Sequence, residues 1–571
     1  MEFTDKQNEI LDKSKHGLFV VKAAPGSGKT FTIAKKAIDI IEAWDSHGGL
    51  ALLSFTNIAV DEMKETFKLF DPSFEIQYPH FIGTLDSFIN NYIFLPFGHL
   101  EMKCNCRPKL IGKPFNNWVN PLYARQRFTE ITRNLDGEWV KVPGSKLEHN
   151  WKSNTYLITE KERLIRKGYA NRADAHYYAL KVLENHENIL NLLINRFPYI
   201  ILDEAQDTSD IQMQILNKLT ENGLKNVILV GDPEQAIYEW NDANPMLFEN
   251  KYQEWKTHSI ELNENFRCSS SICEFISKFS HTNFVSKSEN NLLEINPQFK
   301  TYNDEQEIKN IIEEFKQYCD SKGIQNDDNS RAILFRGQNF ANNFKSEGLY
   351  SIFEIFKGNQ LEPTFTRFVV LGKYLWDLGY VKEGFKLLEK AYLTLSENVY
   401  FVSNELISSV IEEKGLLKHR KDILKFIHEL PTAKPTDDIN NWIDIINSNF
   451  DLGITLKNIT DTKFQGLFKD IQLNLEHSND DNHYGTIHSV KGKSFRAVLL
   501  ILKEKPPNAK KYSKLFEQYN LLKEEELRIP YVAMTRAKEI LWIVIPESEK
   551  RAWVRKANSN PPSLSIQQTL F

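Results

Sequence analysis

The chain has 571 residues, which at roughly 150 residues per domain suggests about four domains and excludes a single small binding module. Apolar residues make up 41%, aromatic residues 12% and charged residues 26%, a composition that excludes a chain that is disordered or of low complexity as a whole. The formal net charge is −5, so no overall basic field attracts the chain to nucleic acid, and any DNA contact has to come from a local groove.

Short apolar runs, separated by helical stretches, recur along the chain. Each run has the length and composition of a strand that is buried on both faces, as in a parallel sheet covered by crossover helices. In the first half the runs span 18–23, 50–56, 199–205 and 227–232, and in the second half they span 332–337, 497–502 and 540–546. The sequence therefore predicts an α/β protein with two parallel-sheet cores.

Mainly helical stretches separate the strand-rich regions, and polar breaks mark the boundaries between them. We expect each core to carry one inserted, mainly helical domain. The first core is predicted at 1–90 plus 196–265 with its insert at 91–195, and the second core at 266–345 plus 481–571, including a C-terminal tail, with its insert at 346–480.

The N-terminus and the cysteines predict a cytoplasmic protein. The opening stretch, MEFTDKQNEILDK, is charged throughout and lacks the basic and apolar regions of a signal peptide. No apolar run approaches the roughly 18 residues that a membrane span requires. The 5 cysteines are too few for a disulfide framework, and the close pair Cys104 and Cys106 has no second pair to complete a zinc site.

The stretch AAPGSGKT at 23–30 follows the first predicted strand and opens a helical run. Its glycines allow backbone N–H groups to turn toward phosphate oxygens at a helix N-terminus. Lys29 is then predicted to reach the β- and γ-phosphates of ATP, and the Thr30 hydroxyl to bind Mg²⁺. The residues expected to contact the nucleotide are Gly26, Ser27, Gly28, Lys29 and Thr30. The alternative is a chance glycine-rich turn.

A pair of acidic residues ends the hydrophobic run in YIILDEAQD. Asp203 is predicted to hold Mg²⁺ there, and Glu204 to polarise the water that attacks the γ-phosphate. An acidic pair that stands alone after a strand is usually solvated surface. Together with Lys29, this pair indicates a site that hydrolyses ATP.

With these motifs the chain resembles the superfamily 1A DNA helicases of the UvrD, Rep and PcrA type, and further motifs of that family follow in order along nearly the whole chain. The resemblance implies two RecA-like cores with ATP between them. It also implies nucleotide contacts outside the glycine-rich loop. Gln7 would contact the adenine edge, Phe266 would stack on adenine, Gln235 would couple the nucleotide to DNA, and Arg267 and Arg536 would face the γ-phosphate as arginine fingers.

The same resemblance implies a set of residues that contact DNA. They lie in SFTNIAVDEMK, GTLDSF, VGDPEQAIYEW and GTIHSVKGKSF, at Phe55, Thr56, Asn57, Thr84, Tyr238, Trp240 and His488. Aromatic side chains in such a groove stack on bases, each stack contributing about 1–3 kcal/mol. The alternative for the aromatic residues is burial in a core.

Four positions depart from the family pattern. Phe31 replaces the usual Arg after GKT, Asp86 the usual His, Asn241 the usual Arg and Ser494 the usual Glu. These departures bear on adenine and ribose selectivity and on the finer DNA contacts, whereas the hydrolytic set is intact.

We therefore expect an ATP-dependent translocase on single-stranded or tailed DNA and a 3′ to 5′ helicase, with the polarity implied by the family. The compact second insert and the residues of the motifs resemble the accessory branch of helicases found in phage-defence operons, the GajB type of Gabija. This resemblance implies an OLD-family, GajA-like nuclease partner. The alternative is a nucleotide-gated sensor of DNA ends that unwinds little. The basic cluster at 414–421 either grips duplex phosphates or forms a solvated helix face.

The chain ends in QQTLF, which resembles the Q-x-x-L-F peptide that bacterial DNA enzymes insert into the sliding clamp. The resemblance implies that Gln567 bonds at the rim of the clamp pocket and that Leu570 and Phe571 fill it. The alternatives are a flexible tail and a tail whose last two residues fold back onto the second core.

Overall fold

The computed structural model describes most of the chain. The described residues are 3–12, 16–45, 47–111, 130–142, 145, 147, 151–153, 155–239, 242–288, 292–341, 344, 352–356, 358, 360–399, 402, 404–449, 466–471, 483–505 and 510–559. The chain divides into two compact units, one of Met1–Leu110, Glu130–Lys345 and Asp481–Phe571, the other of Ile111–Thr129 and Ser346–Asp480. Both sheets of the predicted cores lie in the first unit.

The first sheet has six parallel strands in the order β10-β1-β9-β8-β2-β3. The strands are β1 (Leu18–Ala23), β2 (Leu50–Ser54), β3 (Phe81–Thr84), β8 (Tyr199–Leu202), β9 (Asn226–Gly231) and β10 (Ile260–Leu262). Because the strands are parallel, their carboxyl ends meet at one edge, where the loops after β1 and β8 lie together.

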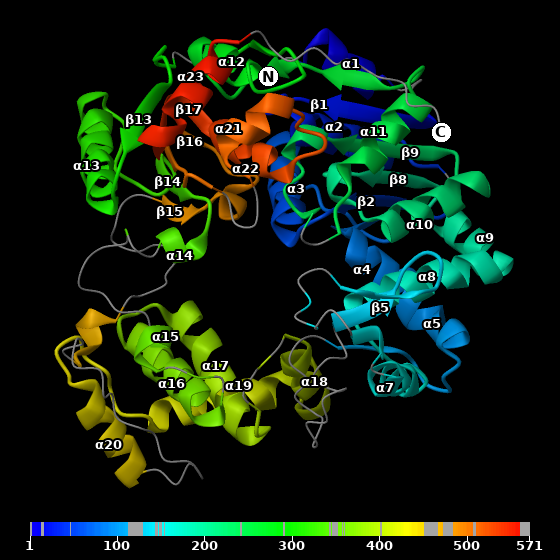
Figure 1. Cartoon of the computed structure of the whole chain (residues 1–571). Helices are drawn as coiled ribbons and strands as arrows, with labels where there is room; N and C mark the ends of the chain where they lie inside the picture. The colour runs from blue at the N-terminus through cyan, green and yellow to red at the C-terminus, as the bar shows by residue number, and fades with distance from the viewer. Residues whose placement is uncertain are drawn as a thin grey trace. The chain divides into compact units, whose positions relative to one another are not determined.

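Alternate side chains of this sheet pack against two layers of helices (Figure 1). Phe19 and Val21 face α1 (Asp5–Leu11), α2 (Lys29–Glu42) and α3 (Asn57–Phe70). Val20 faces the other layer, which consists of α4 (Leu85–Ile89), α8 (Arg172–Asn185), α9 (Glu187–Arg196), α10 (Asp210–Glu221) and α11 (Pro245–Glu254). The strands are mostly apolar because both faces of the sheet are covered.

The second sheet has five parallel strands in the order β13-β17-β16-β14-β15. They are β13 (Gln298–Tyr302), β14 (Arg331–Phe335), β15 (His483–Thr486), β16 (Phe495–Ile501) and β17 (Ala537–Pro546). One face packs against α13 (Glu305–Ser321), and the other against α12 (Ser270–Ser277), α22 (Glu525–Met534) and α23 (Lys550–Ala557). The predicted α/β class with two parallel sheets is confirmed.

Between β3 and β8 the described chain is mainly helical, with two short pairs of strands. The helices are α4, α5 (Leu95–Met102), α7 (Thr155–Ile165), α8 and α9, with a π-helical turn at Asn90–Phe94. The strand pairs are β4 (Lys109–Leu110) with β7 (Tyr169–Ala170) and β5 (Ile131–Arg133) with β6 (Trp139–Lys141). Short elements elsewhere in the first unit are β11 (Glu264–Asn265), β12 (Val285–Ser286), α14 (Gln338–Ala341) and α21 (Tyr512–Leu515).

The second compact unit, taken by itself, is helical where it is described. Its helices are α15 (Ile352–Ile355), α16 (Leu361–Asp377), α17 (Val381–Ser396), α18 (Asn404–Lys414), α19 (Leu416–Glu429) and α20 (Ile439–Asn449). Phe365, Ile423 and Trp442 belong to its larger apolar core, and α18 contributes Leu406 and Val410 to a second, smaller cluster. The basic cluster spans the junction of α18 and α19, where Lys418, Arg420 and Lys421 are exposed to solvent.

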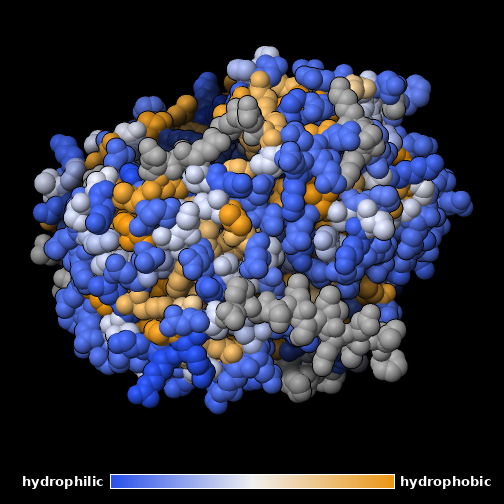
Figure 2. Space-filling view, turned by 90° about the horizontal axis from the view of Figure 1, so that it is seen from above, coloured by the Kyte–Doolittle hydropathy of each residue, from blue (hydrophilic) through white to orange (hydrophobic). Residues whose placement is uncertain are grey.

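Among the described residues, no helix is both long enough and apolar enough to cross a membrane. Hydrophilic residues cover most of the face shown in Figure 2, and apolar residues lie among them in small groups.

Candidate active site

The glycine-rich loop connects β1 to α2 in the backbone conformation that phosphate binding requires. Gly26 and Gly28 have positive φ values of 69° and 73°, and Gly28 caps α2, whose first residue is Lys29. Glycine adopts this left-handed region without the steric cost that a Cβ adds. The first backbone N–H groups of α2 therefore point out of a helix N-terminus beside a turn of further N–H groups, an arrangement that binds anions.

The loop packs directly against the segment that carries Arg267. A Cβ on Gly26 would lie 2.8 Å from the Cβ of Arg267 and 2.9 Å from Oδ1 of Asn265. The Asn265 amide donates to the Pro25 carbonyl at 2.8 Å, and its Oδ1 accepts from the backbone N–H of Arg267 at 2.8 Å. Asn265, which the sequence reasoning passed over inside LNENFR, thus holds Arg267 beside the loop.

Gln7 and Phe266, the two predicted adenine contacts, both lie next to Gly28 although they are far apart in the sequence. A Cβ on Gly28 would lie 2.9 Å from Nε2 of Gln7 and 4.0 Å from Cδ2 of Phe266. The Gln7 amide is oriented by a capping box with Thr4 and donates to the Ser27 carbonyl at 3.2 Å. Phe31, the departure after GKT, stacks with the ring of Phe3 at a centroid distance of 5.3 Å.

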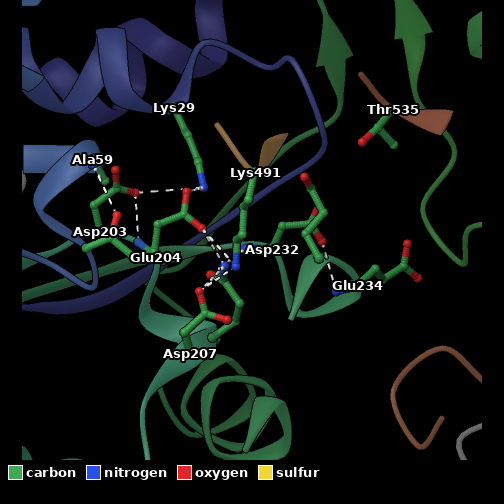
Figure 3. Close-up of polar contacts among 12 residues, drawn as sticks. Lys29, Ala59, Asp203, Glu204, Asp207, Asp232, Glu234, Lys491 and Thr535 are labelled. Carbon is green, nitrogen blue, oxygen red and sulfur yellow. Dashed lines mark hydrogen bonds and ion pairs between the residues drawn. The ribbon is translucent and has the colours of Figure 1, made fainter. Parts of the chain in front are cut away.

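The carboxylates after β8 face the lysine of the loop (Figure 3). Lys29 forms an ion pair with Glu204, and its Nζ lies 3.9 Å from Oδ1 of Asp203. Burial by itself would lower the pKa of Lys29, but the charges of Glu204 and Asp203 outweigh it and raise that pKa. Burial raises the pKa of Asp203. Glu204 has a positive φ of 55°, a conformation that costs a residue with a side chain about 1–2 kcal/mol.

Residues of the second sheet complete the cluster from the other side. Arg536 is buried and donates to Oε1 of Gln235, whose Nε2 donates to Oδ2 of Asp232 at 2.6 Å. Burial and the nearby Arg267 lower the pKa of Arg536 to about 9, so the guanidinium remains charged at pH 7. Arg267 in turn donates to the Thr535 carbonyl at 3.0 Å. The structure thus brings together the predicted hydrolytic residues of both cores.

Lys491 is a residue of this cluster that the sequence reasoning missed. Its Nζ lies 2.5 Å from Oδ2 of Asp207 and 3.8 Å from Oε2 of Glu204, as the dashed lines in Figure 3 mark. It also lies 4.6 Å from the centroid of the Tyr238 ring, a cation–π contact. The signal was available in HSVKGK, where Lys491 lies three residues after His488, which was singled out as a DNA contact.

Three of the predicted DNA-contacting rings form one group. Phe55 and Tyr238 stack at 5.8 Å with an interplanar angle of 25°, and the His488 ring lies 6.3 Å from Tyr238. All three side chains are partly exposed, so they are not core aromatics. Burial and the charge of Arg336 lower the pKa of His488 to about 4, so its imidazole is neutral at pH 7.

The predicted threonines on the same side of the sheet are helix caps. The Thr56 hydroxyl accepts from the backbone N–H of Ala59 at 3.2 Å, and Asn57 is the first residue of α3. The Thr84 hydroxyl accepts from the backbone N–H of Ser87 at 3.1 Å. Trp240 and Asn241 lie outside the described residues, as do Gln567, Leu570 and Phe571.

Asp86, which stands where the family has His, is the centre of a polar cluster. It accepts from Nε of Arg172 and from Nε2 of Gln212, and Nε2 of His176 lies 3.0 Å from it. Burial would raise the pKa of Asp86, but the charges of His176 and Arg172 outweigh it and hold that pKa well below its usual range. In this chain Asp86 therefore connects α4, through its hydrogen bonds and ion pairs, to α8 and α10.

A cavity of about 280 Å³ lies at the opposite edge of the first sheet. It is lined by Lys36, Trp44 and the residues that begin β8 and β9, Tyr199 and Asn226. Since the glycine-rich loop follows the carboxyl end of β1, this cavity is separate from the ATP cluster. Among the residues that the structure describes, no group of three or more His, Cys, Asp or Glu side chains is arranged to hold a metal ion.

Family models match both halves of the chain. The UvrD/REP helicase N-terminal domain matches residues 3–107 and 141–256, and the UvrD-like helicase C-terminal domain matches residues 382–548. The chain belongs to the UvrD-like helicases. It is accordingly an ATP-dependent DNA helicase, a hydrolase, and the two parallel sheets are RecA-like cores.

Individual relatives of this helicase extend over nearly its whole length at low identity. The Gabija protein GajB of Bacillus cereus is 26% identical over 94% of this chain and 94% of the relative. The ATP-dependent DNA helicase PcrA of Staphylococcus aureus is 23% identical over 99% of this chain and 85% of the relative. A probable DNA helicase II homolog of Mycoplasma capricolum is 25% identical over 46% of this chain and 38% of the relative.

Proposed function

We propose that this helicase is an ATP-driven translocase on single-stranded DNA that unwinds tailed duplexes in the 3′ to 5′ direction. The observation that carries the proposal is the position of Lys491. This one ammonium group contacts the carboxylates of the ATP cluster, Asp207 and Glu204, and the ring of Tyr238. A change in the charge of the ATP site therefore reaches the aromatic group by direct contact.

In this proposal the residues of the first core prepare the phosphate chain for attack. Lys29 releases Glu204 when it turns to the γ-phosphate oxygens, and the freed carboxylate orients the attacking water. The Thr30 hydroxyl and the Asp203 carboxylate are the hard oxygen ligands that suit Mg²⁺, which would neutralise charge on the phosphates when bound.

The second core contributes the positive charges that the transition state needs. Arg267 and Arg536 would turn from their present acceptors, the Thr535 carbonyl and the Gln235 amide, toward the transferring phosphoryl group. ATP binding would then pull the cores together, and hydrolysis would release them. Phe55, Tyr238 and Trp240 are the proposed stacking platform, with Thr56, Asn57, Thr84 and His488 as further DNA contacts.

The test is strand displacement on matched 3′-tailed, 5′-tailed and blunt duplexes, with ATPase measured on the same substrates. We expect displacement of the 3′-tailed duplex only, and ATPase that single-stranded DNA stimulates. Lys29→Ala and Arg536→Ala should each abolish both activities. Displacement of the 5′-tailed duplex alone would overturn the polarity. ATPase near the wild-type level in Arg536→Ala would show that the second core does not complete the site.

A second candidate is a nucleotide-gated sensor of DNA ends that works beside a nuclease in antiviral defence. The observation that favours it is the match to the Gabija protein GajB, which covers nearly the whole of both chains. A sensor needs the same ATP cluster and the same DNA platform, but it needs little unwinding. Strong DNA-stimulated ATPase without displacement on any of the three substrates would favour this candidate, and co-purification with an OLD-family, GajA-like nuclease would support it.

A further inference from the structure

The segment Ala236–Glu239 belongs to the first core, and the second core contacts it at both ends. It follows Gln235 and carries Tyr238, the ring that stacks on Phe55. From the second core, α22 reaches it through two residues. Oε1 of Glu525 accepts the backbone N–H of Glu239 at 3.0 Å, and Arg528, one turn further along the same helix, donates to the Ala236 carbonyl and to the Glu239 carboxylate.

Arg528 has no contact with solvent and uses all three of its guanidinium nitrogens. Nε donates to the Ala236 carbonyl, Nη2 to the Glu239 carboxylate and Nη1 to the Leu521 carbonyl of its own core. A buried guanidinium is costly unless each donor is paired, so these contacts form together or not at all. The guanidinium is a planar fork with fixed donor directions, and it therefore fixes the distance between residues 236 and 239.

The same helix leads into the ATP cluster. α22 ends at Met534, and Arg536, which donates to Gln235, follows two residues later. α22 is one continuous helix from Glu525 to Met534, although it includes Pro530, and it packs against the second sheet. A displacement of Arg536 in response to the nucleotide therefore displaces Arg528, and with it both ends of the segment that carries Tyr238.

We infer that Arg528 and Glu239 form a clamp that positions Tyr238 for DNA according to the state of the ATP site. Arg528 is a positioning residue here, since it reaches DNA only through the backbone on either side of Tyr238. Lys491 contributes the cation above the Tyr238 ring, and the Arg528–Glu239 clamp sets where that ring stands. This inference rests on the proposed function and specifies how its two sites communicate.

The test of the clamp compares the ATPase rate in the presence of DNA with the basal rate in its absence. Glu239 is 36% exposed at its side chain, and Glu239→Ala removes the carboxylate that pairs with Nη2 of Arg528. We expect a basal, DNA-free ATPase within twofold of wild type and a DNA-stimulated kcat about tenfold lower. Glu239→Gln, which keeps an acceptor oxygen, should recover part of that loss. Arg528→Lys, which keeps the charge but loses the fork, should resemble Glu239→Ala.

Two further measurements separate positioning from a general loss of structure. The double variant Arg528→Lys with Glu239→Ala should lose no more stimulation than the worse single variant, because both remove one clamp. Arg331 is the matched control, since it is also buried but the acceptors of its hydrogen bonds all lie in the second core. They are the Asp320 carboxylate, the Asn326 amide oxygen and the carbonyls of Lys316 and Ile324. Arg331→Lys should lower the thermal stability and leave the ratio of stimulated to basal ATPase unchanged.

The inference is overturned if Glu239→Ala is stimulated by DNA as strongly as wild type, or if the losses in the double variant multiply. It is also overturned if Arg331→Lys loses stimulation as fully as Arg528→Lys. Fluorescence of 2-aminopurine in an oligothymidylate, which reports base stacking, should fail to respond to ATP in Glu239→Ala. A wild-type enzyme that DNA does not stimulate at all would instead refute the proposed function itself.

Discussion

The close contact between the glycine-rich loop and the Arg267 segment predicts a severe effect of a single methyl group. In Gly26→Ala the new Cβ would stand 2.8 Å from the Cβ of Arg267, whereas ordinary van der Waals contact begins near 3.4 Å. The φ of 69° adds a strain of about 1–2 kcal/mol for a residue with a side chain. Overpacking against an atom next to the backbone costs a further ~1–3 kcal/mol.

The two segments can relieve the clash only by separating. Separation breaks the hydrogen bond from the Phe266 N–H to the Gly26 carbonyl, which is 2.9 Å long, and it moves Arg267 away from the phosphate site. Together these contributions give a penalty of about 2–5 kcal/mol on the assembled site, which corresponds to a loss in kcat/KM of about 30- to 5,000-fold. Steady-state ATPase in the presence of saturating oligothymidylate measures this loss, and binding of a fluorescent ATP analogue reports the part that comes from affinity.

Gly323→Ala provides the matched control. Gly323 has nearly the same positive φ, 68°, but a Cβ there meets nothing within 4 Å. It should lower thermal stability through strain alone and leave ATPase at the wild-type level. The reasoning fails if Gly26→Ala retains ATPase within about threefold of Gly323→Ala, because the loop and the Arg267 segment would then not need to touch.

Four further predictions address the chemistry, the DNA platform, a titration and the tail. Glu204→Gln should still bind ATP, but it should lower turnover by at least about 100-fold because the attacking water would lose its general base. Single-turnover hydrolysis measures this loss, and turnover near wild type would show that another residue acts as the base. Tyr238→Ala should weaken binding of oligothymidylate by about 1–3 kcal/mol in fluorescence anisotropy, whereas loss of folded protein would indicate a core aromatic instead. The pKa of His488 is lowered to about 4, so its imidazole should stay neutral between pH 5.5 and 8. In an NMR titration its Cε1 signal, assigned by its loss in His488→Gln, should therefore not shift in that range. A titration midpoint near 6.5 would contradict the burial of this side chain. A peptide of the last dozen residues should bind a cognate sliding clamp at about micromolar affinity, and Leu570→Ala with Phe571→Ala should abolish that binding without changing ATPase; no binding by peptide or full-length protein removes the clamp as a partner.

The sequence by itself determined the elements whose causes are local. Seven apolar runs predicted strands, and each overlaps a strand of the two sheets, with Leu18–Ala23 matching at both ends. The glycine-rich loop was predictable because glycine at 26 and 28 permits the left-handed backbone that places Lys29 at a helix N-terminus. The position of Asp203 after a buried strand followed from the same local pattern.

Only the tertiary structure decided which polar groups that are far apart in the sequence meet. Lys491 and Asp207 are 284 residues apart in sequence, Arg528 and Glu239 are 289 apart, and Asn265 and Pro25 are 240 apart. A single Lys, Glu or Asn in a sequence is most often an exposed surface residue, and the residues next to it in the sequence do not indicate where its partner lies. Burial decides the role of these residues, because a charge that leaves water needs a partner at hydrogen-bond distance, and only the folded arrangement of loops and helices supplies that partner.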